Sequence, residues 1–108
     1  VAGRRLRPKL PIRVVRSAAD QIMEAAAWWD ANRPKAPGLF REEIVRALEL
    51  ISAQPQIGAK AGNAGLAGVR RVHLSCIHYH LYYRVRESPR VVEVLALWHT
   101  SRGSGPGL

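Results

Sequence analysis

The sequence predicts an α+β fold of the order β-α-α-β-β-β, in which a helical hairpin packs on a small, mostly antiparallel sheet. Two segments with helical periodicity, residues 17–33 and 39–53, are separated by a short loop that contains proline and glycine. Residues 69–102 then form three short runs of strand-like residues joined by polar turns. With 108 residues, of which 47% are hydrophobic, the chain is predicted to be a single domain with its own core.

The first strand and the first helix are predicted from β-branched and apolar positions. Residues 10–16 (LPIRVVR) favour a strand that starts at about Ile12. Ser17 is predicted to cap the helix, because its hydroxyl can accept a hydrogen bond from a free backbone N–H, and Pro34 ends the helix. The predicted apolar stripe is Ile22, Ala25, Ala26 and Trp29, widened by Met23, Ala27 and Trp28.

The second helix is predicted over residues 39–53 and has the clearer apolar pattern, which Gln54 and Pro55 end. Its stripe is Phe40, Ile44, Ala47, Leu48 and Ile51. The glycine-rich residues 56–68 lack the GxxxxGK[ST] pattern of a phosphate-binding loop. We therefore predict a mobile connection, from which Lys60 can reach a partner.

Three strands are predicted after this connection, at residues 69–74, 79–86 and 91–99, with turns at 75–78 and 87–90. In the middle strand, alternation assigns Tyr79, Leu81, Tyr83 and Val85 to one face and His80, Tyr82, Arg84 and Arg86 to the other. The last strand, VVEVLALWH, is apolar on both faces, which indicates a central strand covered on both sides.

The composition predicts a cytoplasmic protein without a membrane partner. No apolar run approaches the roughly 20 residues of a spanning helix, and the basic N-terminus lacks the apolar block of a secretory signal. The single cysteine, Cys76, excludes an internal disulfide. Both ends, residues 1–10 and 103–108, are predicted to be flexible because they are rich in proline, glycine or basic residues.

The net charge of +9, from 17 Lys and Arg against 8 Asp and Glu, favours an acidic partner, either nucleic acid or an acidic protein. Six of the eight acidic residues lie between positions 20 and 49: Asp20, Glu24, Asp30, Glu42, Glu43 and Glu49. Because only Glu87 and Glu93 follow, the second half of the chain is predicted to present a nearly unopposed basic surface.

The histidines of the last three strands raise two chemical interpretations, metal binding and proton transfer. His78 and His80 form an HxH pattern, but His78 falls in a turn and no carboxylate is near, so we predict no metal site and no cofactor. His80, Tyr82 and Arg84 share a predicted strand face, where they could support RNA cleavage. The alternative is that Arg84 pairs with Glu93 on the neighbouring strand.

Five stretches together resemble the RelE/ParE superfamily of bacterial toxins, and are closer to ParE, the plasmid stabilisation proteins. The resemblance covers residues from about Val14 to Arg102, and the stretches that carry it are AADQIMEAAAWWDANRP, FREEIVRALELISAQPQIG, VRRVHL, HYHLYYRV and VVEVLALWHTSR. The resemblance implies the family's fold, which agrees with the order of elements predicted above. It also implies the growth-inhibiting toxin of a type II toxin–antitoxin system, bound in a hetero-oligomer by a cognate acidic, ParD-like antitoxin.

The superfamily is divided in function, and the sequence departs from one of its branches. ParE-like members poison DNA gyrase without being enzymes, whereas RelE-like members are endoribonucleases that cut mRNA on the ribosome. His80 stands where the nucleases carry an arginine, and the GSGPGL tail lacks their tyrosine or histidine. These departures favour the ParE-like function. The RelE-like nuclease and a non-catalytic domain that binds nucleic acid remain the alternatives.

Each of these functions predicts its own set of site residues. The predicted target-binding residues are Arg71, Arg84, His99 and Arg102. In the nuclease alternative, the catalytic face is His80, Tyr82, Arg84 and His99. The antitoxin is expected over the helical hairpin and an exposed sheet edge, at Trp28, Trp29 and Arg46.

Overall fold

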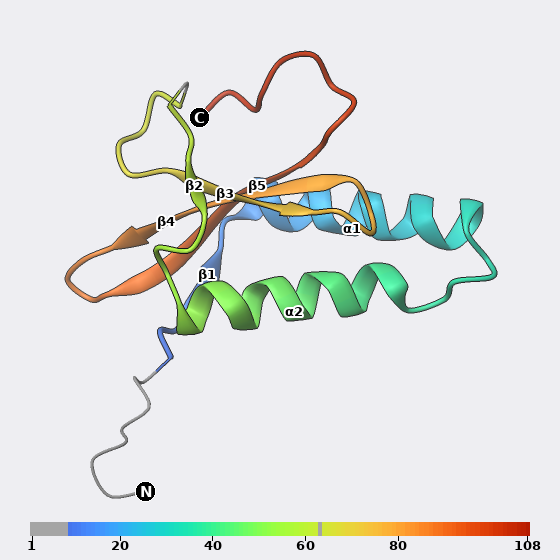
Figure 1. The fold of residues 1–108 in the computed structure, drawn as a ribbon, viewed down its shortest axis with the longest axis horizontal. Helices are drawn as coiled ribbons and strands as arrows, with labels where there is room; N and C mark the ends of the chain where they lie inside the picture. Colours follow the sequence, from blue (N-terminus) through green and yellow to red (C-terminus); the bar gives the residue numbers. More distant parts are fainter. Residues whose placement is uncertain (1–8, 63) are drawn as a thin grey trace, which may run out of the picture.

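The computed structural model describes residues 9–62 and 64–108, and it confirms the predicted α+β class (Figure 1). The elements are β1 (Ile12–Val14), α1 (Arg16–Asn32), α2 (Leu39–Ala53), β2 (Ala59–Lys60), β3 (Arg70–Leu74), β4 (Tyr79–Arg86) and β5 (Val91–His99). Strand β2 was not predicted and lies within the expected mobile connection. Most of the predicted flexible N-terminal arm, residues 1–8, falls outside the described residues.

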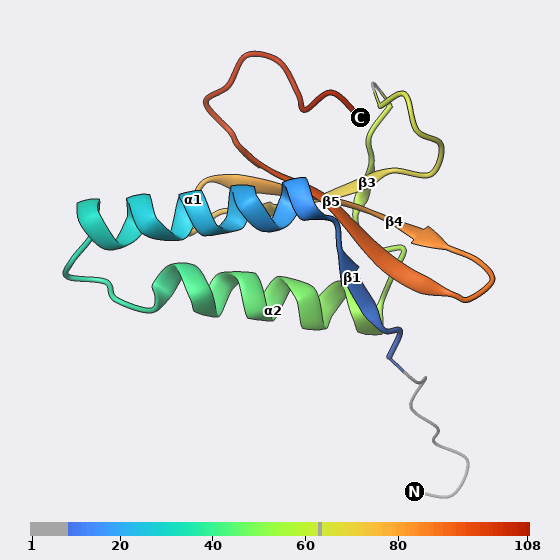
Figure 2. The ribbon, with the colours of Figure 1, turned by 180° about the vertical axis from the view of Figure 1, so that it is seen from behind.

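Within the described residues, five strands form one mixed sheet in the order β1-β5-β4-β3-β2. Strand β1 runs parallel to β5, and the remaining neighbours are antiparallel. The predicted central position of β5 is confirmed, since it has strand neighbours on both sides. Both helices cover one face of the sheet, whereas the C-terminal segment runs over the other face, which we call the outer face (Figures 1 and 2). No helix in the described segments is long and apolar enough to cross a membrane.

The main core lies between the helix layer and the sheet. It joins Ala18, Ala25 and Trp29 of α1, Phe40, Ile44, Ala47 and Ile51 of α2, and Leu81, Tyr83, Val92, Val94 and Leu97 of the sheet. The two helical stripes predicted from periodicity are thus confirmed at their centres. Helix α2, β4 and β5 also have the predicted bounds, because long regular patterns determine where an element ends.

Two details predicted for α1 are wrong. The helix begins at Arg16 with Val15 at the cap position and no side-chain cap, so Ser17 lies inside it. The reason is that the Val15 N–H donates to the Val94 carbonyl at 3.1 Å, which lets the helix follow β1 directly. Met23, Ala27 and Trp28 do not widen the stripe, because all three are exposed, Met23 to 69% and Trp28 to 49%. Each follows or precedes a core-facing residue by one position, and one step turns a helix by about 100°.

A second, smaller apolar cluster covers the outer face of the sheet. It consists of Val69, Tyr82, Leu95 and Ala96, with Ala61, Ala64, Trp98 and Leu108 packed against it. An irregularity in the β4–β5 register, where Tyr82 faces Ala96 and Tyr83 faces Val94, leaves Leu95 as an extra residue in β5. The segment predicted as a flexible tail lies along this cluster, and the Trp98 indole N–H donates to the Ser104 carbonyl at 2.6 Å.

Candidate functional site

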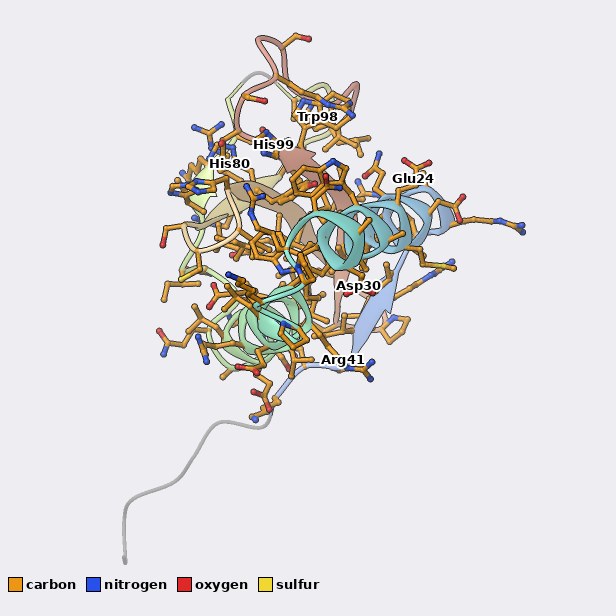
Figure 3. The ribbon with its side chains drawn as sticks, turned by 90° about the vertical axis from the view of Figure 1, so that its right-hand side faces the viewer. Glu24, Asp30, Arg41, His80, Trp98 and His99 are labelled. Carbon is orange, nitrogen blue, oxygen red and sulfur yellow. The ribbon has the colours of Figure 1, made fainter. Side chains whose placement is uncertain are left out.

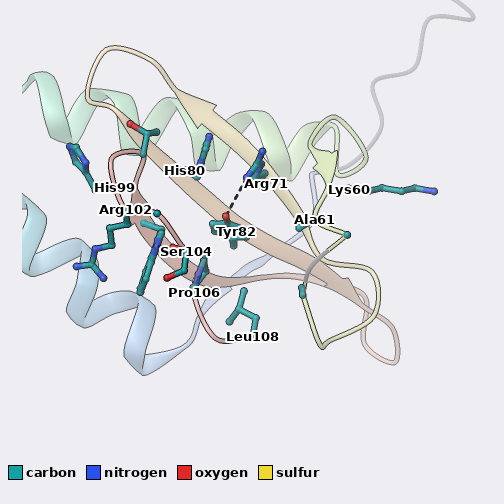
Figure 4. A pocket seen from close by; sticks show the side chains of 16 residues that line it. Lys60, Ala61, Arg71, His80, Tyr82, His99, Arg102, Ser104, Pro106 and Leu108 are labelled. Atoms are coloured by element: carbon teal, nitrogen blue, oxygen red, sulfur yellow. Dashed lines mark hydrogen bonds between the residues drawn. The ribbon is translucent and has the colours of Figure 1, made fainter.

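The outer face carries a hollow of about 470 Å³ between the sheet and the C-terminal segment (Figure 4). Its basic lining residues are Lys60, Arg71, His80, His99 and Arg102, contributed by β2, β3, β4, β5 and the C-terminal segment. No aspartate or glutamate is among the lining residues of the described chain. We call this feature the cationic hollow.

Arg71 and Tyr82 form the floor of the cationic hollow. They are cross-strand partners on β3 and β4, and Arg71 Nη1 lies 3.5 Å from the Tyr82 hydroxyl oxygen (Figure 4). Tyr82 is only 6% exposed, whereas Arg71 is exposed. The contact orients the guanidinium and leaves most of its five N–H donors facing the hollow and the solvent.

His80 lies beside Arg71 and Tyr82, and its pKa is lowered. Burial lowers the pKa of His80 below that of a free histidine, and the positive charges of Arg71 and His73 lower it further. The ring of His73, its cross-strand partner, is 5.1 Å away between centroids. His80 is therefore a neutral imidazole at pH 7, able to accept a proton or a hydrogen bond.

His99 lines the same hollow and supplies a hydrogen-bond donor, whereas His80 supplies an acceptor. The Ser101 N–H donates to His99 Nδ1 at 3.1 Å, and the Ser101 hydroxyl lies 2.7 Å from the same nitrogen. Because Nδ1 accepts a hydrogen bond, the proton of the neutral ring resides on Nε2. His99 thus offers an N–H donor, while Arg102 stacks over the Trp98 ring at 4.1 Å from its centroid.

Arg84 was predicted for both the target-binding and the nuclease surface, but it does not line the cationic hollow. Its Nε lies 2.9 Å from the Oε1 of Glu93, a residue that is only 4% exposed, and Arg86 lies 3.9 Å from the other carboxylate oxygen. The alternative interpretation, a cross-strand pair with Glu93, is what the structure shows. This pairing separates Arg84 from Arg71, His80, Tyr82, His99 and Arg102, which the hollow brings together.

The residues predicted for antitoxin contact occupy three different environments on the helix layer. Trp29 is 6% exposed, and its indole N–H donates to the Ala36 carbonyl at 3.2 Å. Trp28 is half-exposed, with the Arg33 guanidinium 5.4 Å from its ring. Arg46 is exposed and pairs with Glu43 at 2.8 Å. A groove of about 490 Å³ between the helices is lined by the apolar residues Ile22, Ala26, Phe40, Ile44 and Val45, together with Asp30, Gly38 and Arg41.

Within residues 9–62 and 64–108, no three His, Cys, Asp or Glu side chains come together as metal ligands. His78 stands in the β3–β4 turn with a φ of 63°, whereas His80 is on the strand. The HxH pattern therefore does not place both rings on one strand face.

Sequence reasoning did not place His73 beside His80, and it did not predict that Trp98 and the residues after Arg102 line the hollow. Alternation could have placed His73 beside His80, because the two strands are joined by a short turn. No local signal indicates that Lys60 enters the sheet as part of a two-residue strand. Figure 3 shows the two sides of the sheet: His80, Trp98 and His99 lie on the side away from Glu24, Asp30 and Arg41.

Fold and site together define a small basic α+β protein with an apolar groove on its helix layer and a cationic hollow on the opposite face. The family described as ParE toxin of type II toxin-antitoxin system, parDE, matches residues 12–103. The chain therefore belongs to the ParE toxin family, as its sequence predicted.

One similar solved structure is described as the chromosomal ParDE TA system from P. aeruginosa. The match has a TM-score of 0.66 at 15% sequence identity and covers 88% of this chain and 100% of the other. At this identity the match supports the fold. The comparison with curated proteins gives no significant match.

Proposed function

We propose that this ParE-type toxin arrests bacterial growth by poisoning DNA gyrase, and that a cognate acidic antitoxin neutralises it. The observation that carries the proposal is the cationic hollow, where basic groups from five segments converge and no described lining residue is acidic. A surface of this kind attracts an acidic macromolecular target and speeds its encounter.

The proposed target surface is centred on Arg71, His99 and Arg102. All three line the hollow, and the guanidinium of Arg71 is exposed. Arg84 has a structural role in this proposal, because its charge is already neutralised by the buried Glu93 carboxylate. It supports the sheet beneath the target surface rather than contacting the target.

The proposed antitoxin is ParD-like and forms a hetero-oligomer with the toxin over the hairpin groove, with Trp28 and Arg46 at the contact and Trp29 supporting Trp28 from below. The lining of the groove is mainly apolar, with Asp30 and Arg41 as its charged members, and it suits an amphipathic helix. Strand β2 pairs only with Arg70 and Arg71, so the outer edge of β3 from Val72 to Leu74 has no strand partner in the described chain. An extended segment of the antitoxin could add to this edge.

A RelE-like ribonuclease is the second candidate function. One observation favours it, since a neutral His80, an N–H donor on His99 and the Arg71 guanidinium line the same hollow. Such groups could accept a proton from a 2′-hydroxyl, donate to a leaving oxygen and neutralise a phosphate. The missing strand arginine and tail residue of the nucleases, noted above, weigh against it.

Controlled expression in a bacterium, with growth, plasmid supercoiling and mRNA integrity measured together, separates these functions. We expect growth arrest with altered plasmid topology and intact mRNA, and we expect Arg71→Gln to relieve the arrest at equal protein level. Arg41→Gln, which removes the same charge from α2, is the matched control and should leave the arrest unchanged. Cleaved mRNA with unchanged topology would support the nuclease, and normal growth would refute both.

A further inference from the structure

We infer that the cationic hollow binds the phosphodiester backbone of a single nucleic-acid strand directly. The inference rests on the proposed function, because it names the chemistry that the target surface recognises. In that function the strand is the DNA on which the target acts; in the nuclease alternative it is mRNA.

The charge of the hollow selects a polyanion. Arg71, Lys60 and Arg102 are exposed, and within the described residues no ion pair engages any of them. The four ion pairs of the described residues instead use arginines elsewhere on the protein. Arg71 contacts the Tyr82 hydroxyl through Nη1, so most of its N–H groups remain available to another acceptor. A guanidinium can donate to two oxygens of one phosphate.

Two histidines of the hollow complete a phosphate site. His99 presents Nε2–H as a donor, because Ser101 occupies its other nitrogen. His80 stays uncharged at neutral pH and can accept a hydrogen bond from a sugar or a base. The volume of about 470 Å³ is that of a small-ligand pocket, with room for one or two nucleotides. A double helix is too wide to enter a space of this volume, because its major groove alone is about 12 Å wide.

The distribution of apolar side chains favours nucleic acid over an acidic protein segment as the occupant. Protein interfaces gain most of their affinity from apolar or aromatic anchors buried near their centre. The apolar and aromatic residues that line the hollow, Tyr82, Trp98 and Leu108, are packed into the cluster on the outer face. The large hydrophobic side chains that the structure leaves exposed, among them Met23, Trp28 and Val45, lie outside the hollow. Binding to a phosphate backbone needs charge and hydrogen-bond donors, which the hollow supplies.

The test is fluorescence anisotropy of a fluorescein-labelled 12-nucleotide DNA strand, and of the RNA strand of the same sequence, with purified toxin and no gyrase. We expect Arg71→Gln to weaken binding about tenfold, as expected for a lost charged hydrogen bond. It should also reduce the slope of log affinity against log salt by about 0.7, the share of one phosphate contact. Arg71→Lys should retain most of the binding, and Arg41→Gln should change it less than about twofold.

Circular dichroism establishes that each variant is folded, and Arg102→Gln replaces Arg71→Gln if that variant is not. Preference for DNA, preference for RNA or equal binding all support the inference and identify the source of the strand. No binding, an equal loss in Arg41→Gln, equally tight binding of a duplex, or equal competition by polyglutamate and polyphosphate would overturn it. Since gyrase is absent, a negative result here together with growth arrest and altered plasmid topology leaves the proposed function standing.

Discussion

Gly58 stands where the chain leaving α2 passes under the edge of the sheet, and replacing it with alanine should destabilise the protein. A Cβ atom at this position would lie 2.7 Å from the Tyr83 hydroxyl, 2.9 Å from Tyr83 Cε1 and 2.9 Å from the Arg71 carbonyl oxygen. Neither neighbour can yield easily. Tyr83 is fully buried, and its hydroxyl donates to the Pro55 carbonyl at 2.7 Å and accepts from the Gly58 N–H at 2.9 Å.

The expected cost follows from these contacts. Overpacking a filled site costs about 1–3 kcal/mol, and a buried polar group that loses its partner costs about 1–3 kcal/mol. Because the two effects share one displacement, we expect Gly58→Ala to lower the free energy of unfolding by about 2–4 kcal/mol. Gly62→Ala is the matched control, since among the described residues its Cβ would meet nothing within 4 Å, and its effect should stay within about 0.5 kcal/mol.

Urea unfolding of both alanine variants, alone and combined with Tyr83→Phe, measures the effect. Removing the Tyr83 hydroxyl eliminates the shortest contact but leaves Cε1 and the Arg71 carbonyl in place. Gly58→Ala should therefore cost about 1 kcal/mol less in the Tyr83→Phe background than in the wild type. A wild-type-like midpoint for Gly58→Ala, or the same cost in both backgrounds, would refute this account of the packing.

Two further predictions concern the outer face. Arg84→Gln should destabilise the protein by about 1–3 kcal/mol, because the buried Glu93 carboxylate then keeps only Arg86, at 3.9 Å, as a partner. The folded variant should still arrest growth. Loss of arrest at an equal amount of folded protein would contradict the structural role of Arg84. Wild-type stability should fall as the pH drops through about 6.5, because the unfolded chain then protonates His80 while its lowered pKa keeps the folded form neutral. The fall should be smaller in His80→Gln, and urea midpoints of equal pH dependence would count against it.

The fold was predictable wherever a pattern extends over several turns or alternations. Helix α2, β4 and β5 have the predicted bounds because their stripes involve many residues in succession. Strand β2 has two residues and no periodicity, and it exists because Ala59 and Lys60 pair with a distant strand. The start of α1 was misjudged for a related reason, since a hydrogen bond from Val15 to β5 determines it rather than the local capping preference of Ser17.

The strand residues of the candidate site could be predicted from the sequence. The exclusion of Arg84 and the position of the C-terminal segment could not. Alternation placed His80 and Tyr82 on one face of β4, and the cross-strand partner of Tyr82 is Arg71. The same alternation could not tell that Arg84 pairs with Glu93, because that depends on the register with β5. The C-terminal segment lacks any periodic pattern, and its position follows from the apolar residues on the outer face that Leu108 helps to cover.

The separation of the two surfaces constrains how an antitoxin could neutralise this protein. The hairpin groove lies on the helix layer and the cationic hollow on the opposite face of the sheet, so a helix bound in the groove would leave the hollow uncovered. The free edge of β3 from Val72 to Leu74 directly follows Arg71 along the same strand. In the proposed function, a segment added to this edge would bring acidic side chains next to the target surface. Affinity would then come mainly from the groove, and neutralisation from the strand edge.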